Sequence, residues 1–267
     1  MPFLEKTIDG LHVELLDITH PWIHPPQTLI FHHGVGANPD IWSKWLPVLA
    51  PDYRIIRFDM RGFGRSAGGA RPGCWTMPQL AKDVISIADE FGLEKLHFVG
   101  ESIGGTIGLF LALAHSERVH SLTLSNAAYC GGAIQNVSAW HQVLSEQGTV
   151  AWSQDMMRAR FYEDGISEAE WRWFETQQAS HPVDSIVQAR NILVDSDLGR
   201  DLPAIKVPVL LLHGDSSPFV PVEQMVEMSR LLPNSELNIF GHARHGLPFS
   251  HGKACAERLR EFLNRHF

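Results

Sequence analysis

The sequence predicts an α/β fold, in which a mostly parallel sheet is covered by helices on both faces and is interrupted once by a helical insertion. From Lys95 onward, short apolar segments alternate with helical patterns at the spacing of strand–helix units. The segment 28–31 is apolar at successive positions, as expected of a strand buried on both faces. The alternation stops between about residues 128 and 200 and resumes at 207, which indicates an insertion within the sheet-forming chain.

Composition and charge restrict the class of protein. Of the 267 residues, 44% are hydrophobic and 19% are charged, which is typical of a folded globular enzyme. The net charge of −8 and the lack of a basic run argue against a nucleic-acid partner. No apolar run reaches about 18 residues, and the first residues lack the profile of a signal peptide. We therefore expect a cytoplasmic protein with no membrane partner and with three free cysteines.

The part of the chain before the strand at 96–100 contains four predicted strands and two predicted helices. The turn signal Asp9-Gly10 separates the first two strands, and prolines between 21 and 26 end the second. Apolar residues at helical spacing predict a helix that Gly92 closes. The predicted strands are 3–9, 11–18, 28–31 and 53–58, and the predicted helices are about 40–49 and 77–91.

The remaining predicted elements lie on either side of the insertion. The insertion contains four of the eight tryptophans, in helical periodicity and without a clear strand. We therefore predict an α/β core made of residues 1–127 and 201–267, with a helical insertion at 128–200. The predicted strands here are 96–100, 121–124, 207–212 and 236–240, and the predicted helices are 106–115, 222–232 and a last one from about 252.

A serine stands between the strand at 96–100 and the helix after it, within Gly100-Glu101-Ser102-Ile103-Gly104. A strand-to-helix turn this tight crowds the positions two before and two after the serine, so both must be nearly free of side chain. The serine is then forced into a strained backbone conformation that exposes its hydroxyl above the helix N-terminus. This geometry suits a nucleophile, and Ser102 is the predicted one.

A serine hydroxyl needs a base to take its proton, and two histidines follow the last predicted strand. Sites in open parallel sheets form at the carboxyl ends of the strands, so either His242 or His245 could face Ser102. We favour His245, because Gly246 and the apolar residues 247–249 suit a side chain presented from a loop. No HExxH motif or carboxylate cluster accompanies the pair, so we expect no metal and no cofactor.

The oxyanion formed in acyl transfer needs preorganised backbone N–H donors. One predicted donor is the amide of Ile103, directly after the nucleophile. The other is expected in the loop after the strand at 28–31, where small residues let the backbone approach a substrate. We choose Val35 as this donor, and Gly34 is the alternative.

The acid that orients the histidine is harder to assign. The loop after the strand at 207–212 holds one carboxylate, Asp215, which we predict to be the acid. The alternative is that Asp215 is a turn residue and that the acid lies elsewhere. The other position for an acid, at the end of the strand before the insertion, holds Asn126.

Five segments occur in the order and at the spacing found in the α/β-hydrolase superfamily: HHGVG, FDMRGFGRS, GESIGG, LLLHGDSSPFVP and ARHGLPFSH. The chain resembles this superfamily over nearly its whole length. The resemblance implies an eight-stranded, mostly parallel sheet, with a helical cap inserted after the sixth strand. It also implies the chain order serine, acid and histidine, which fits Ser102, Asp215 and His245. The segment from Leu122 to Trp140 looks like the start of the cap in 3-oxoadipate enol-lactone hydrolases.

One position departs from the superfamily pattern. Many relatives have a second aspartate two residues after the first in this loop, and that second aspartate is the triad acid. Here the equivalent position holds Ser217. Either Asp215 takes the role from a shifted loop, another loop supplies the acid, or the triad is altered.

Together these residues predict a cofactor-independent serine hydrolase that cleaves a small carboxylic ester or lactone through an acyl-enzyme. The aromatic insertion predicts a mostly apolar pocket, for which Gly34, Trp140, Phe161 and Phe219 are the candidate lining residues. Two alternatives share the fold: hydrolysis of a C–C bond in a ring-cleavage product, and ligand binding without catalysis. The expected partner is a small-molecule substrate, and the oligomeric state, including a homodimer, is left open.

Overall fold

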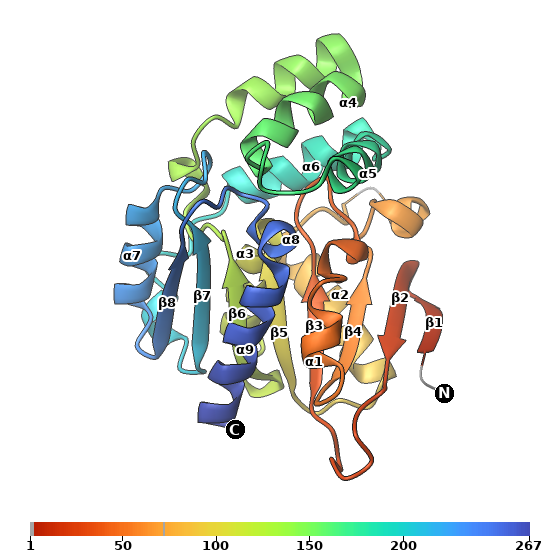
Figure 1. Cartoon of the computed structure of the whole chain (residues 1–267), viewed down its shortest axis with the longest axis vertical. Coiled ribbons are helices and arrows are strands. Elements are labelled where there is room, and N and C mark those ends of the chain that lie inside the picture. The colour runs from red at the N-terminus through yellow and green to blue at the C-terminus, as the bar shows by residue number, and fades with distance from the viewer. Residues whose placement is uncertain (1–2, 72) are drawn as a thin grey trace.

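The computed structural model describes residues 3–71 and 73–267, which form one eight-stranded sheet (Figure 1). The strand order is β1-β2-β4-β3-β5-β6-β7-β8, and the pairs β1–β2 and β2–β4 are antiparallel, whereas all others are parallel. The predicted eight-stranded, mostly parallel sheet is therefore confirmed. The strands are β1 Phe3–Ile8, β2 Leu11–Leu16, β3 Thr28–His32, β4 Arg54–Phe58, β5 Leu96–Glu101, β6 Val119–Ser125, β7 Val209–Gly214 and β8 Ser235–Phe240.

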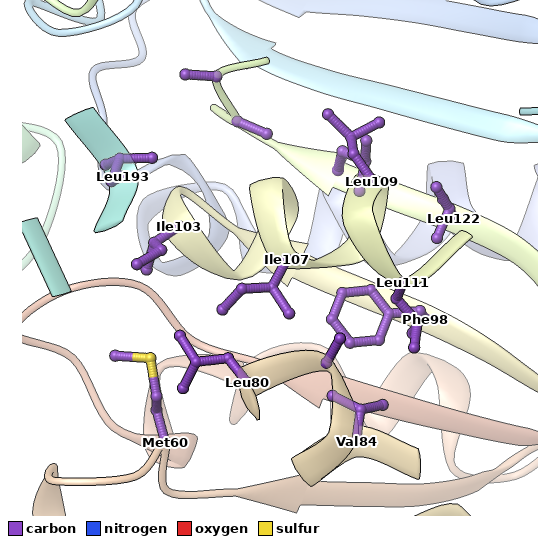
Figure 2. Close-up of a cluster of buried hydrophobic side chains, with 14 of the residues drawn as sticks. Met60, Leu80, Val84, Phe98, Ile103, Ile107, Leu109, Leu111, Leu122 and Leu193 are labelled. Atoms are coloured by element: carbon purple, nitrogen blue, oxygen red, sulfur yellow. The ribbon is translucent and has the colours of Figure 1, made fainter. Parts of the chain in front are cut away.

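Helices cover both faces of the sheet, because side chains along each strand point alternately to opposite faces. In β3, Ile30 joins the core beneath α2 (Met77–Glu90) and α3 (Ile103–Ala114), whereas Leu29 and Phe31 join the core beneath α1 (Leu46–Leu49) and α9 (Gly252–His266). Figure 2 shows part of the first of these two cores, in which Ile107 of α3 lies near Leu80 of α2. The helices of the core are α1 Leu46–Leu49, α2 Met77–Glu90, α3 Ile103–Ala114, α7 Val222–Leu231, α8 Leu247–Ser250 and α9 Gly252–His266.

Local signals explain where helix α2 begins and ends. The Thr76 side chain accepts a hydrogen bond from the backbone N–H of Gln79, which satisfies one of the free amides of the first turn. Gly92 follows the helix with a φ of +64°, a left-handed conformation that glycine adopts at little cost. The sequence-based boundaries of this helix are correct to within one residue at its C-terminus.

The segment that we predicted as one helix at about 40–49 is divided. The structure has a short 3-10 helix, η1 Pro39–Trp42, and then the single turn α1 Leu46–Leu49. Pro47 lies in the first turn of α1, where it has no N–H to donate to a preceding turn. The hydrogen bond that would tie this turn to the preceding one is therefore missing, and the two pieces stay separate.

Residues 128–200, which we call the insert, lie between β6 and β7 and contain three longer helices at the carboxyl ends of the strands (Figure 1). These are α4 Ser138–Arg160, α5 Glu168–Ala179 and α6 Val183–Val194. Helix α4 is kinked at Gly148, where φ is 79° and ψ is −175°. Across the described part of the chain, no helix has the length and apolarity needed to span a bilayer. The division into two domains stays a prediction.

Candidate active site

Ser102 forms the turn between β5 and α3. Its φ of 55° and ψ of −121° are unusual for a residue with a side chain, so the predicted backbone strain is present. A Cβ atom at Gly100 would lie 2.5 Å from the carbonyl carbon of Gly104, and one at Gly104 would lie 2.5 Å from the backbone oxygen of His32. The two glycines are therefore required by close backbone contacts, as the sequence predicted.

The structure brings His245, not His242, to the serine. The Nε2 atom of His245 lies 3.1 Å from Ser102 Oγ, and the His245 ring is buried. The backbone amides of His245 and Gly246 donate to carbonyls at the end of α4, which holds this loop against the insert. The exposed ring of His242 instead stacks on Tyr162 and bonds Asp164.

The position beside His245 where we expected the triad acid is occupied by a serine hydroxyl. Ser217 Oγ lies 3.0 Å from His245 Nδ1, on the side of the ring opposite Ser102. Asp215 does not contact His245, so the predicted orienting contact is wrong. Its two carboxylate oxygens accept the backbone N–H groups of His242 and Ala243, at 3.0 and 3.1 Å. Asp215 thus fixes the turn that leads to His245, which is the alternative that the sequence had left open.

Asn126 has a role that the sequence did not reveal. It follows β6 with a φ of 48°, and its amide nitrogen donates to the backbone oxygen of His245 at 2.8 Å. Its side-chain oxygen accepts the N–H of Gly214 at 3.1 Å. An amide is suited to this position because it donates and accepts at once, which a carboxylate does not. Asn126 therefore ties the histidine loop to the end of β7.

The loop after β3 packs against the strand-to-helix turn from Gly100 to Gly104, which we call the elbow. A Cβ atom at Gly34 would lie 2.9 Å from Ser102 Cβ, so the backbone at this point needs a glycine. Ile103 is the first residue of α3, where a backbone N–H has no partner within the helix. The next residue of the loop, Val35, is buried. Ile103 thus adjoins Ser102 in sequence, and Val35 follows the glycine that packs on Ser102; the oxyanion role of both stays a prediction.

A model of the alpha/beta hydrolase fold family matches residues 27–185, which is more than half of the chain. The chain belongs to the alpha/beta hydrolase fold family, and it is a hydrolase. A protein named putative carbamate hydrolase RutD, from Caulobacter sp. strain K31, is 26% identical over 268 residues, which cover 97% of each chain.

Solved structures of hydrolases have the same fold. The enol-lactonase of Burkholderia xenovorans LB400 has a TM-score of 0.86 at 20% identity, with 98% of this hydrolase and 100% of the other chain covered. An esterase of Exiguobacterium antarcticum has a TM-score of 0.85 at 23% identity, with 99% and 100% covered. At these identities the likeness shows the shared fold and leaves the substrate undecided.

A small cavity of about 10 Å³ reaches Ser102 and His245 in this hydrolase. Two of the predicted lining residues, Trp140 and Phe219, form part of its wall, and the ring of Phe219 stands edge-on to the His245 ring at 4.8 Å. Gly34 and Phe161 are not among the residues that line this cavity, which corrects the prediction for both. Phe161 lies elsewhere. Its ring packs on Phe174 and against Gly246, so it supports the histidine loop from behind.

A buried arginine and a buried glutamate lie beside Ser102, and this pair was not predicted. The Nη1 atom of Arg160, at the end of α4, lies 3.5 Å from Glu101 Oε1. Arg160 also donates to the backbone oxygen of Val35 and to Gln178, both at 2.6 Å. The only sequence signal was the glutamate directly before the serine, because Arg160 is 59 positions away in the insert.

Burial controls the protonation of the site. Desolvation has the largest effect on His245 and holds its pKa well below the usual 6.5. The positive charge of Arg160 and electrostatic repulsion from His213 lower this pKa further. The same desolvation raises the pKa of Glu101, and the charge of Arg160 opposes that rise. A neutral imidazole is the form that can accept the Ser102 proton, so the histidine is available as a base at neutral pH.

Proposed function

We propose that this hydrolase cleaves a small carboxylic ester or lactone through an acyl-enzyme on Ser102. The observation that carries the proposal is the 3.1 Å contact between Ser102 Oγ and His245 Nε2, made by a serine on a strained strand-to-helix turn. A buried neutral base within hydrogen-bond distance of a serine hydroxyl is the arrangement that activates it as a nucleophile. A purely structural serine has no need of either feature.

In the first half of the reaction, Ser102 Oγ attacks the carbonyl carbon and its proton passes to His245 Nε2. The oxyanion that forms accepts hydrogen bonds from the backbone N–H groups of Val35 and Ile103. As the C–O bond breaks, the proton on His245 passes to the leaving oxygen, which leaves the acyl group on Ser102. In the second half, water takes the place of the alcohol, gives a proton to His245 and releases the acid and free Ser102.

The walls of the cavity favour an apolar acyl group. Apart from Ser102, Asn126 and His245, its lining is hydrophobic. The residues are Ala128, Ile134, Val137, Trp140, Leu193, Phe219 and Val220. A volume of about 10 Å³ holds no more than a water molecule, so part of the wall must move to admit a substrate.

Trp140 and Phe219 are the part of the wall that we propose to move. Both also line an outer groove of about 320 Å³ between α4 and the loop after β7. Their rings meet edge-on at 5.3 Å, and because both line the two cavities, we propose that this contact separates the inner cavity from the groove. In this proposal the insert acts as a cap, and a substrate enters through the outer groove when the two rings separate.

The proposal is tested with a fluorophosphonate probe, which reacts with activated serines. Wild type is expected to be labelled, His245→Ala is expected to lose labelling, and His242→Ala is the matched control that keeps it. The wild-type protein is then assayed on p-nitrophenyl butyrate, an enol-lactone, a carbamate ester and a C–C ring-cleavage product. Absence of labelling in folded wild-type protein contradicts the serine mechanism, and turnover of only the ring-cleavage product contradicts the ester or lactone assignment.

A further inference from the structure

The carboxylate of Glu101 has no part in the mechanism above, although it adjoins the nucleophile. The residue is 1% exposed, and its carboxylate faces two donors, the backbone N–H of Gly34 and the guanidinium of Arg160, neither of which reaches it with good hydrogen-bond geometry. Burying an ionised carboxylate is costly unless other charges compensate it. A glutamate in this position therefore needs an explanation in terms of the groups that it faces.

Arg160 is the first of these groups, and it is held firmly. Its Nε and Nη2 atoms donate to Gln178 and to the Val35 backbone oxygen, so the guanidinium plane has little freedom. The remaining Nη1 atom faces Glu101 Oε1 at 3.5 Å. The positive charge of Arg160 favours the ionised form of Glu101 and opposes the effect of burial on its pKa.

His245 is the second group. Its Nε2 atom lies 3.9 Å from Glu101 Oε1, too far for a hydrogen bond but close for an interaction between charges. On the other side of the ring, Nδ1 meets the uncharged hydroxyl of Ser217. Within the described residues, Glu101 is the only group that brings a carboxylate within 4.0 Å of a nitrogen of this ring. Arg160 and His213 both act on the ring in the opposite sense.

We propose that Glu101, held by Arg160, stabilises the imidazolium of His245 and so replaces the acid that this triad lacks. This inference rests on the proposed serine-hydrolase function. When Ser102 attacks, its proton passes to Nε2, and the new positive charge appears on the side of the ring that faces Glu101. No bond to Glu101 forms or breaks. Glu101 acts through His245 on a charge that develops only as the reaction proceeds, so it is a positioning residue that raises the rate more than it affects binding.

The substitution Glu101→Gln tests the proposal, because it removes the charge and keeps the shape. We expect the plateau rate of fluorophosphonate labelling and kcat for an ester to fall about tenfold or more, with KM changed little. We also expect the acid limb of the pH–rate profile to move to lower pH, because the imidazolium loses a nearby negative charge. A merely structural role for Glu101 does not predict that shift.

The double variant Glu101→Gln/Ser217→Asp is the decisive comparison, since it returns a carboxylate to the ring at Nδ1. We expect it to recover most of the lost rate and to move the acid limb back to higher pH. Where Glu101→Gln fails to fold by circular dichroism, Glu101→Gln/Arg160→Gln with and without Ser217→Asp makes the same comparison, because neither buried charge is then left alone.

Three results would overturn the proposal. The first is a folded Glu101→Gln protein with wild-type rate and pH profile, which means that the Glu101 charge does not act on the reaction. The second is a slowed, folded variant whose rate Ser217→Asp does not restore, which means that the loss has another cause. The third is a folded wild type that the probe does not label, and this result overturns the proposed function as well. The first two leave the proposed function intact.

Discussion

Two loops meet His245 from opposite sides, and they differ in how closely they follow the expected pattern. On one side, the elbow from Gly100 to Gly104 has the glycines, the strained serine and the 3.1 Å contact between Ser102 Oγ and His245 Nε2. On the other side, the loop from Gly214 to Val220 places Ser217 against the ring and turns Asp215 away. Close backbone contacts restrict the side chains of the elbow. The loop from Gly214 to Val220, which we call the acid loop, is instead held by backbone hydrogen bonds from Asp215 and Ser216 that do not depend on the side chain at position 217.

The largest expected effect is at the elbow. Ser102→Ala removes the nucleophile, so labelling should disappear and turnover should fall by about 10⁴-fold or more. Ser216→Ala is the matched control, because Ser216 is an exposed serine of the acid loop. Labelling is measured by in-gel fluorescence and turnover by p-nitrophenyl butyrate hydrolysis. A Ser102→Ala protein that is still labelled would move the nucleophile to another residue.

The second effect concerns the backbone of the elbow. Gly100→Ala places a Cβ atom 2.5 Å from the Gly104 backbone, so the free energy of unfolding should fall by about 1–3 kcal/mol in urea titrations. Gly132→Ala is the control, because a Cβ atom there would have no neighbour within 4 Å. Equal stability of the two variants would show that the elbow is not restricted by backbone contact.

The third effect is at Ser217, where a substitution can give the acid loop the carboxylate of the expected pattern. Burial keeps the pKa of His245 well below 6.5, so the acid limb of the wild-type rate profile should lie below pH 6.5. Ser217→Asp places a negative charge at Nδ1, which favours the imidazolium and raises this pKa. The acid limb should therefore move to higher pH, and the plateau rate should rise by about tenfold. Ser217→Ala is the paired variant, and it should lower the plateau rate without moving the acid limb to higher pH.

The smallest expected effect is at Asp215. Because this carboxylate bonds backbone amides and not His245, Asp215→Asn should change kcat by less than about threefold, far from the ~10⁴-fold loss that follows removal of a triad acid. Unfolding should be easier by roughly 1 kcal/mol, because an amide accepts only one of the two N–H groups well. A loss of kcat near that of Ser102→Ala would make Asp215 the acid after all.

Most of the fold could be predicted because its signals are local. The strand Thr28–His32 contains the apolar run 29–31, and helix α2 is bounded by Thr76 and Gly92, so each can be recognised from adjacent residues. The helix expected at about 40–49 was divided between Trp42 and Leu46, just before Pro47; the prediction missed this because the helical spacing of the apolar residues was given more weight than the missing N–H of this proline.

The sequence by itself determined the strained turn at Ser102, the proposed nucleophile, since the need for Gly100 and Gly104 on either side of it depends on five consecutive residues. Only the tertiary structure decided between His242 and His245, and between Asp215 and Ser217. Both members of each pair stand in one loop, and the direction of a loop side chain depends on contacts with distant segments, such as the carbonyls at the end of α4. The Glu101–Arg160 pair depends on tertiary structure for the same reason, because the insert alone brings its arginine to the elbow.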